Sequence, residues 1–457
     1  MSQLGNSPAS RDIAYVLHGY TDHEAHKEQG PHILQGGKGI YVYDDTGKEF
    51  IEGMAGLWCT SLGYGEERLV EVATEQLRKL AYTHLFAGKS HDPAIDLAER
   101  LVEMAPVPMS KVFFNNSGSE GNDTVVKMVW YYHNAIGRPE KKKIISRIKG
   151  YHGVTVASAS LTGLPNNHRD FDLPIANILH TSCPHYYRFG EEGESEVEFA
   201  TRCAAELEAM ILEEGPDTVA AFIAEPVMGA GGVIVPPKTY FEKIQAVLKK
   251  YDVLFIADEV ICGFGRTGNM WGCQTFDLQP DMITCAKALS SAYLPISAVL
   301  INEKVADGIV ANSGKIGTLG HGYTYMGHPV AAAVALETLK IYEERDVMGH
   351  VTAVAPRMQQ RLASYSSHPL VGEVRGVGLV GALELVKNKA TKEPFEPAGK
   401  VGAYLVNRAK DHGLILRNIV DSVAFSPPLI ISSDELDSVF DRFDKALEET
   451  ASFAAGL

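Results

Sequence analysis

Short apolar runs alternate with helix-period segments through the middle of the chain. Between about residues 90 and 330, these runs are 111–114, 143–148, 219–224, 253–257, 282–285 and 296–301. Continuous apolar runs of this length are typical of strands that are buried on both faces, and the segments between them have the period of amphipathic helices. The region therefore predicts an α/β fold with a mainly parallel sheet covered by helices.

The two ends of the chain have different patterns. Residues 39–53 place two aromatic and β-branched runs around an Asp-Asp-Thr-Gly turn, which predicts a hairpin. After Pro329, an alanine-rich segment at 330–344 predicts a helix, and further α/β elements follow it. In that C-terminal region, turns are expected at Gly376, Gly378 and Gly381.

The simplest partition has one large and one small domain. We expect the large domain to span residues 57–330. The small domain would combine residues 1–56 with residues 331–457, so that both chain ends contribute to it. A chain of 457 residues is long enough to bury a sizeable core.

Composition narrows the classes of partner. Asp and Glu total 57 against 42 Lys and Arg, which gives a net charge of −15. This charge would repel nucleic acids and anionic membranes, so small-molecule partners are expected. The six cysteines include no CxxC pair and the first residues lack a basic and apolar signal pattern, which favours a reducing, cytoplasmic location. Charged residues or prolines interrupt the apolar segments before the ~20 residues that a membrane span requires.

Two residues at predicted strand ends indicate the central chemistry. Asp258 directly follows the run 253–257, and Lys287 follows the run 282–285 within the apolar sequence Thr-Cys-Ala-Lys-Ala-Leu. Pyridoxal phosphate needs a lysine amine for a Schiff base and a carboxylate that keeps its ring nitrogen protonated, and a desolvated lysine is a usable nucleophile. On the residues alone, Asp258 is explained equally well as a cap for the following loop, and most lysines are solvated surface charges.

Two loops offer further contacts for such a cofactor. Ser117, Gly118 and Ser119 follow a predicted strand and open a helical pattern. Amide groups at such a helix start can hold a phosphate dianion, although a serine N-cap explains the same residues. Tyr151 and His152 lie in a Gly-Tyr-His-Gly segment after the next strand, where an aromatic ring can stack on a flat heterocycle; an ordinary exposed turn is the alternative.

Two other patterns lack the context that their chemistry needs. Gly263 to Gly268 has the spelling GxGxxG, but no apolar helix follows it. We therefore expect a loop that lets the backbone approach the cofactor side of the sheet, and not a dinucleotide site. Among the 16 histidines, the pairs His180 with His185 and His321 with His328 do not form a metal-ligand pattern such as HExxH, so no metal site is expected.

With these segments assembled, the sequence resembles the class III, fold-type I, pyridoxal-phosphate aminotransferases, and most closely the amine:pyruvate transaminases, also called omega-transaminases. The likeness extends from about Tyr41 to Pro428. It rests on motifs that occur in a specific order: Asn116-Ser117-Gly118-Ser119-Glu120, Lys149-Gly150-Tyr151-His152-Gly153, Ala224-Glu225-Pro226-Val227, Ile256-Ala257-Asp258-Glu259-Val260, Ala286-Lys287-Ala288-Leu289 and His321-Gly322-Tyr323-Thr324-Tyr325. The resemblance implies a large domain with a mainly parallel, seven-stranded sheet.

The resemblance also implies the roles of the cofactor-site residues. Lys287 would hold the cofactor as a Schiff base and then carry the proton between Cα of the substrate and C4′ of the cofactor. Asp258 would pair with the pyridinium nitrogen, Tyr151 would stack on the ring, and Gly118 and Ser119 would donate to the phosphate. The implied cofactor-binding set is Ser117, Gly118, Ser119, Tyr151, His152, Glu225, Asp258, Val260, Lys287 and Thr324.

The implied substrate side combines one arginine with aromatic walls. Arg417 matches the arginine that binds the acceptor's carboxylate in amine:pyruvate enzymes and swings away for amines that lack one. On spacing alone, it is an unremarkable surface charge. Trp58, Phe86 and Tyr20 match positions that form the apolar walls of the pocket, to which Tyr151 also contributes, and ordinary core packing is the alternative explanation.

The expected function is that of a homodimeric aminotransferase that uses pyridoxal 5′-phosphate. It would move an amino group from a primary amine to pyruvate, giving L-alanine and an aldehyde or ketone by ping-pong half-reactions through pyridoxamine phosphate. Thr324 would reach the phosphate of the neighbouring subunit, so the site would exist only in a dimer, and pairing of dimers into tetramers is left open. The alternatives are a class III enzyme for taurine, β-alanine, an ω-amino acid or diaminopelargonate, an aminomutase, or a cofactor-binding protein without turnover.

Overall fold

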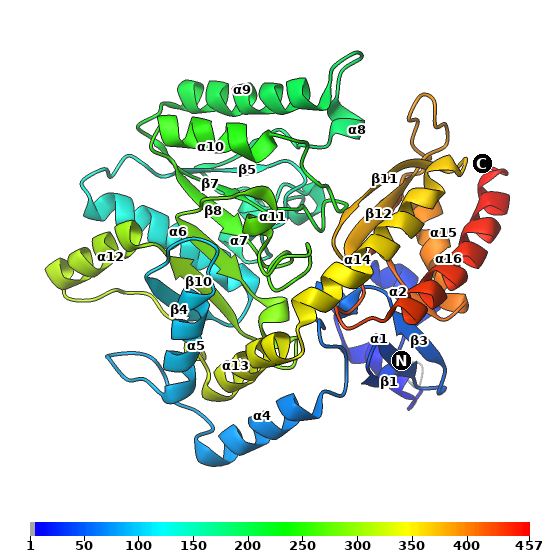
Figure 1. Ribbon diagram of the computed structural model, residues 1–457, viewed down its shortest axis with the longest axis horizontal. Coiled ribbons are helices and arrows are strands. Elements are labelled where there is room, and N and C mark those ends of the chain that lie inside the picture. The colour runs from blue at the N-terminus through cyan, green and yellow to red at the C-terminus, as the bar shows by residue number, and fades with distance from the viewer. Residues whose placement is uncertain (1–4) are drawn as a thin grey trace.

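The computed structural model describes residues 5–457, and a seven-stranded sheet forms its centre (Figure 1). Neighbouring strands are parallel except β10, which is antiparallel to both β4 and β9. In spatial order the strands are β4 (Lys111–Asn115), β10 (Ser297–Ile301), β9 (Met282–Cys285), β8 (Leu254–Asp258), β7 (Val219–Ala224), β5 (Lys143–Arg147) and β6 (Ile178–Thr181). The predicted α/β class and the mainly parallel sheet are confirmed.

Six of these strands were predicted, and β6 was missed. Each predicted run agrees with its strand to within one residue at either end. The strand β6 lies at the edge of the sheet, is four residues long and includes His180 and Thr181. Because it has no continuous apolar run, only its parallel pairing with β5 identifies it as a strand.

Helices cover both faces of the central sheet. Ala221 and Ile223 of β7 pack into the apolar cluster that contains residues of α6 (Gly118–Ala135) and α12 (Glu303–Ile316). Phe222, which points to the opposite face, packs into the cluster with α9 (Glu196–Glu214) and α10 (Tyr240–Lys250). The other helices of this part of the chain are α4 (Glu67–Lys79), α5 (Asp92–Glu103), α7 (Val156–Leu161), α8 (Tyr186–Phe189), α11 (Gly272–Phe276) and the short 3-10 turns η1 (Pro165–Asn167) and η2 (Lys287–Ser290).

The N- and C-terminal parts of the chain meet in a second, four-stranded sheet. Its order is β1-β2-β3-β13, and Ile415 of β13 pairs in parallel with Glu52 of β3. This pairing supports the grouping of residues 1–56 with 331–457, although the boundary proposed at residue 330 falls inside α13 (Pro329–Glu344). The elements before residue 60 are α1 (Pro8–Tyr15), α2 (His23–Gln29), β1 (Leu34–Lys38), β2 (Tyr41–Asp44), β3 (Glu49–Glu52) and α3 (Ala55–Trp58).

A third sheet, with the order β11-β12-β15-β14, belongs to the C-terminal part. The elements of this region are α14 (Val347–Ser364), η3 (Tyr365–Ser367), β11 (Val371–Val377), β12 (Val380–Leu385), α15 (Lys400–Asp411), β13 (Leu414–Ile415), β14 (Arg417–Ile419), β15 (Ser422–Phe425) and α16 (Ser433–Ala454). Figure 1 shows α14 and α16 on one side of this region, near the C-terminus.

The prediction of three glycine turns here was right at one position and wrong at two. Gly378 has φ 58° in the turn between β11 and β12. Gly376 and Gly381 instead lie within these strands and pair with each other. A Cβ atom at Gly376 would approach Oε1 of Gln359 to 2.6 Å, and one at Gly381 would overlap Leu362. Both contacts come from α14, so these two glycines allow a close helix-sheet approach.

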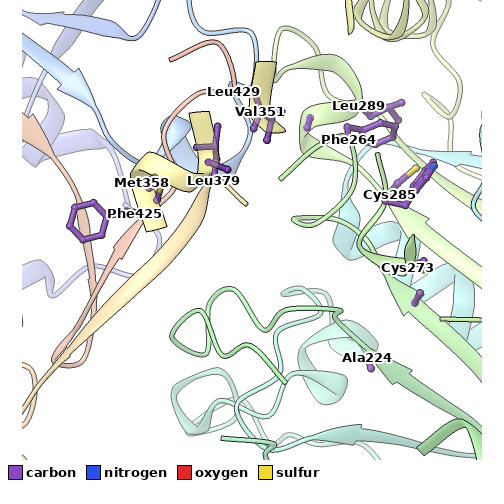
Figure 2. Close-up of a cluster of buried hydrophobic side chains, with 14 of the residues drawn as sticks. Ala224, Phe264, Cys273, Cys285, Leu289, Val351, Met358, Leu379, Phe425 and Leu429 are labelled. Atoms are coloured by element: carbon purple, nitrogen blue, oxygen red, sulfur yellow. The ribbon is translucent and has the colours of Figure 1, made fainter. Parts of the chain in front are cut away.

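One hydrophobic cluster joins the central sheet to the C-terminal region. Figure 2 shows Ala224 and Cys285, at the ends of strands β7 and β9, together with Val351 and Met358 of α14 and Phe425 of β15. All are buried members of the same cluster. Among residues 5–457, no helix is long and apolar enough to cross a membrane.

Candidate active site

Asp258 is the last residue of β8 and its side chain is almost fully buried, with 3% of the residue exposed. Its Oδ2 accepts hydrogen bonds from Nδ1 of His152 at 2.8 Å and from Nδ2 of Asn122 at 2.8 Å. Its Oδ1 accepts a hydrogen bond from the backbone amide of Val260 at 3.1 Å. Three donors therefore hold this carboxyl group in a fixed position inside the protein.

Asn122 is a member of this site that the sequence did not predict. It lies on α6, it is 1% exposed, and its Nδ2 also donates to the carbonyl oxygen of His152 at 2.7 Å. A single asparagine in a helix is usually a surface residue. The available signal was its place on the same helix face as Val125, Val126 and Val129, which are buried.

Lys287 begins η2 immediately beyond β9. Since Asp258 pairs with Thr284 across the parallel strands β8 and β9, the carboxylate and the amine are placed at neighbouring strand ends, as predicted. The backbone of Lys287 has φ 52°, an uncommon conformation for a residue with a side chain. Burial lowers the pKa of its amine, an effect that the negative charge of Asp258 opposes. Within residues 5–457, the amine forms no hydrogen bond or ion pair.

Ser117, Gly118 and Ser119 form the start of α6. Ser117 is the N-cap, because its Oγ accepts a hydrogen bond from the amide of Glu120 at 3.2 Å. The N-cap explanation is therefore correct for Ser117, but it leaves the amides of Gly118 and Ser119 without an acceptor in the described part of the chain. Gly118 also faces Val260, since a Cβ atom there would lie 3.0 Å from a methyl group of Val260. Two free amides at the positive end of a helix can hold an anion.

Glu225 fixes the loop that carries Tyr151. Its Oε1 accepts from the amide of Tyr151 at 2.9 Å, and its Oε2 accepts from the amide of Gly229 at 2.9 Å. Burial raises the pKa of the Glu225 carboxyl group, and the charge of Asp258 adds to that effect. The loop position of Tyr151 is thus set by a buried carboxyl group.

Arg417, Tyr20 and Trp58 were predicted to form the substrate side of the site. Arg417 begins β14 and is partly buried, and its guanidinium group pairs with no carboxylate of residues 5–457. Its positive charge contributes to lowering the pKa of Lys287, which places the two groups within electrostatic range. The Tyr20 hydroxyl accepts from Nδ2 of Asn167 at 2.6 Å. Trp58 is 2% exposed and has φ 64°.

Tyr151 connects this side to the carboxylate side. Burial raises the pKa of its hydroxyl group, the neighbouring Tyr20 raises it further, and Arg417 lowers it. Arg417 therefore lies within electrostatic range of both Tyr151 and Lys287, and Tyr20 lies beside Tyr151.

Phe86 and Thr324 are not brought to Lys287 by their own chain. Both residues are exposed, Phe86 at 41%. Phe86 packs beside Gly322, and the carbonyl oxygen of Thr324 accepts from the Tyr82 hydroxyl at 2.8 Å. Within the described residues, no hydrogen bond or ring contact connects either of them to Lys287, Asp258 or Tyr151.

The glycine-rich loop at 263–268 follows the carboxyl end of β8 and packs against the C-terminal region. Nη1 of the buried Arg266 donates to the carbonyl oxygens of Leu379 at 2.9 Å and Pro427 at 2.6 Å. Gly265 and Gly268 have positive φ angles in this loop. Glycine suits these positions in the contact with the C-terminal region, because other residues rarely adopt positive φ angles.

The comparison with protein families identifies the class of this site. The model described as "Aminotransferase class-III" matches residues 23–447. The chain belongs to the class-III aminotransferases. It is therefore a transaminase of EC class 2.6.1.

The similar proteins of known name are aminotransferases as well. "Gamma aminobutyrate transaminase 3, chloroplastic" of Solanum lycopersicum is 54% identical over 421 residues, which cover 92% of this chain and 81% of that protein. "Probable gamma-aminobutyrate transaminase 3, mitochondrial" of Oryza sativa subsp. indica is 52% identical over 428 residues, covering 93% and 84%.

Solved structures of omega transaminases have the same fold. The enzyme from Pseudomonas jessenii in complex with PMP is 57% identical, covers 98% of this chain and 99% of its own, and has a TM-score of 0.97. A thermostable variant with one tryptophan, one phenylalanine and one arginine substituted, engineered for the synthesis of enantiopure bulky amines, is 57% identical with a TM-score of 0.97, covering 98% of this chain and 100% of its own.

Class-III aminotransferases use pyridoxal 5′-phosphate, and this site fits that cofactor. The class requires an amine, a buried carboxylate and a phosphate-binding group. Within residues 5–457, the partly buried Lys287 has an unpaired amine, Asp258 lies at the adjacent strand end, and the first amides of α6 are free.

Proposed function

We propose that this aminotransferase moves an amino group from a primary amine to pyruvate, giving L-alanine and an aldehyde or ketone. The observation that carries the proposal is the partly buried Arg417, which lies within electrostatic range of Lys287 and has no carboxylate partner among residues 5–457. A guanidinium group binds a carboxylate through two parallel hydrogen bonds. An acceptor with an α-carboxylate, such as pyruvate, satisfies this group.

We propose that Lys287 is the covalent anchor of the cofactor and the base that moves the proton at Cα of the substrate. Its lowered pKa supports this role, because an amine that is less strongly protonated is a better nucleophile and base. When bound, pyridoxal phosphate supplies an electron sink for the charge left at Cα. Asp258 holds a fixed negative charge toward the ring nitrogen, and His152 and Val260 orient that carboxylate.

The remaining cofactor contacts follow from the loops around Asp258. Tyr151 stacks on the ring, from a loop that Glu225 holds in place. Ser117 shapes the start of α6, and the amides of Gly118 and Ser119 donate to the phosphate group. No metal ion has a part in this proposal.

The substrate pocket in this proposal has aromatic walls from Trp58, Tyr20, Phe86 and Tyr151. The similar structure that was engineered for bulky amines carries substitutions of a tryptophan, a phenylalanine and an arginine, which supports a size-limiting role for such residues. Since Phe86 and Thr324 are exposed on their own chain, they complete the site of a second copy, and the active form is a homodimer. A reducing compartment such as the cytoplasm suits the six free cysteines.

A second candidate donor is 4-aminobutyrate, because the named relatives are gamma-aminobutyrate transaminases at 52–54% identity. This donor has a carboxylate at the far end from its amine, and Arg417 is the cation that would receive it. The two candidates share all steps at Lys287 and differ only in what the pocket holds.

The experiment is a donor and acceptor panel on the holoenzyme. Both enantiomers of a chiral arylalkylamine, 4-aminobutyrate, β-alanine, taurine and diaminopelargonate would each be paired with pyruvate and with 2-oxoglutarate. Alanine or glutamate formation would be measured. Alanine from an arylalkylamine supports the proposal, and alanine from 4-aminobutyrate alone supports the second candidate. Product formation with 2-oxoglutarate but not with pyruvate contradicts the proposed acceptor, and isomerisation of an amino substrate without either acceptor indicates an aminomutase.

A further inference from the structure

Asn122 donates two hydrogen bonds at the centre of the buried site. Its Nδ2 donates to Oδ2 of Asp258 at 2.8 Å and to the carbonyl oxygen of His152 at 2.7 Å. It therefore connects three segments: the phosphate-binding start of α6, the loop that carries His152, and the end of β8. Its Oδ1 is buried and has no partner among residues 5–457.

We infer that Asn122 is a positioning residue that keeps the Asp258 carboxylate aligned for the ring nitrogen of the cofactor. The inference rests on the proposed role of Asp258. An amide that donates to a carboxylate stabilises the charged form of that carboxylate. Because the same amide group also holds the carbonyl of His152, a shift of Asp258 would have to break both hydrogen bonds.

The orientation of the Asn122 amide is determined by its surroundings. If the amide were reversed, Oδ1 would face the Asp258 carboxylate and the His152 carbonyl, and three acceptors would meet without a donor. The observed orientation leaves Oδ1 without a partner, and a buried unpaired acceptor costs stability. An apolar residue of the same shape would avoid this cost, so packing alone does not explain an asparagine at this position.

The charges around Asp258 explain why a neutral donor is suited to this position. The titratable groups around Asp258 include the partly buried Lys287 amine and Tyr151 hydroxyl. The buried ones are the His152 ring, the carboxyl groups of Glu225 and Glu259, and the thiols of Cys262 and Cys285. Glu225 already places a second acid in this region. A neutral donor forms a hydrogen bond with the Asp258 carboxylate without adding a positive charge beside it, so the carboxylate stays available to the cofactor.

Two substitutions separate positioning from packing. Asn122→Leu keeps the size of the side chain but removes both donated hydrogen bonds. Asn122→Asp keeps the shape: a protonated carboxyl group can still donate to Asp258, but an ionised one repels it. The matched control is Thr338→Val, which removes a buried hydroxyl on α13 that donates only to the carbonyl of Val334 at 2.8 Å.

The measurements are the dissociation constant of pyridoxal phosphate, and the single-turnover rate of α-proton removal from alanine and from α-deuterated alanine. We expect Asn122→Leu to slow proton removal and weaken cofactor binding by about 10-fold to 150-fold, the range for a hydrogen bond to a charged group. Asn122→Asp should approach the wild type at low pH and lose activity and cofactor affinity as the pH rises and the carboxyl pair ionises. Thr338→Val should lower thermal stability and leave both measurements unchanged.

Asp258→Asn is measured in the same series, so that a wrong role for Asp258 can be distinguished from a wrong role for Asn122. If Asp258→Asn leaves proton removal unchanged, the proposed role of Asp258 is wrong. If Asp258→Asn slows it strongly but Asn122→Leu matches the wild type, only the inference about Asn122 is overturned. Should Asn122→Leu fail to fold, the pH dependence of Asn122→Asp decides, and a flat profile overturns the inference.

Discussion

The carboxylate side and the wall side of the site are built in different ways. Asp258 is 3% exposed and accepts three hydrogen bonds from residues of the central region. On the wall side, Tyr20 is 69% exposed and Phe86 is 41% exposed. A buried charge requires partners that are fixed when the chain folds, whereas an apolar wall requires only a surface to close against it. In the proposed dimer, one chain specifies the charge chemistry and leaves Tyr20 and Phe86 to be covered by another surface.

The charged groups also differ between the carboxylate side and the wall side. On the buried side, loss of water acts on acids and bases in opposite directions: it raises the pKa of Glu225 and lowers that of Lys287. On the wall side, Arg417 retains a positive charge without a carboxylate partner within residues 5–457. The proposed site therefore pairs a carboxylate for the ring nitrogen with a guanidinium group for the substrate.

The largest effect is expected from Lys287→Ala, which removes the centre of the buried side. The variant should fold and bind pyridoxal phosphate weakly, and turnover should be lost because the covalent anchor and the proton carrier are the same amine. The measurements are steady-state turnover and the visible absorbance of the cofactor bound to the lysine. Turnover similar to that of the wild type would contradict the assignment.

A buried lysine elsewhere in the chain supplies the control for this test. Lys141 is 3% exposed, burial lowers its pKa, and its amine donates to the carbonyl oxygen of Asp252 at 2.7 Å. Lys141→Ala should reduce the melting temperature because it leaves buried carbonyl groups unpaired, but the cofactor absorbance should be unchanged. The pair of variants distinguishes a lysine that reacts from one that supports the fold.

The buried side was also the more predictable of the two regions. Asp258 and Lys287 were found because each follows a continuous apolar run, and parallel strands place their ends at one edge of the sheet. Asn122 was missed because its partners, Asp258 and His152, are 136 and 30 positions away in the sequence, so no local pattern records the contact. For the same reason, Gly376 and Gly381 were taken for turns, although the close approach of α14 requires them.

The roles of the wall residues came from family resemblance and not from local pattern. Arg417 lies on the three-residue strand β14, and nothing in its neighbouring residues distinguishes it from a surface arginine. Thr324 is exposed, and its proposed role depends on a surface outside its own chain. Sequence periodicity reports which residues of a chain face its own core, and it carries no information about a partner's site.

Arg417→Ala should produce an effect of intermediate size. It tests the wall side alone, because only the half-reaction with alanine and pyruvate involves a carboxylate that Arg417 can bind. A charge-assisted contact with a carboxylate contributes about 1.5–3 kcal/mol, so alanine and pyruvate should lose roughly 10-fold to 150-fold in apparent affinity. An arylalkylamine without a carboxylate should change little. The measurement is a pair of titrations that follow the loss of the cofactor absorbance with each donor.

Arg417→Lys is the matched control, because it keeps the positive charge but removes the planar guanidinium group. It should recover part of the affinity for alanine, because an ammonium group attracts a carboxylate but does not form two parallel hydrogen bonds with it. Equal losses for alanine and the arylalkylamine in Arg417→Ala would show that Arg417 supports the fold or the cofactor, and the pyruvate proposal would then be withdrawn.

The smallest effect, about twofold, comes from a mixed dimer that tests whether the walls are completed by a partner. One subunit carries Lys287→Ala and the other carries Thr324→Ala, and two different affinity tags isolate the mixed species. If Thr324 contributes to the partner's site, both defects fall in one site and the other site is intact. The mixed dimer should then have about half the wild-type activity and one site with wild-type affinity for pyridoxal phosphate.

If Thr324 acts within its own chain, one site lacks the lysine and the other lacks the threonine, so activity at limiting cofactor should fall to half that of the Thr324→Ala homodimer. Thr324→Ser in place of Thr324→Ala keeps the hydroxyl group, and it should give half the wild-type activity in either arrangement, which shows that the loss in the test pair comes from the hydroxyl and not from the exchange of subunits.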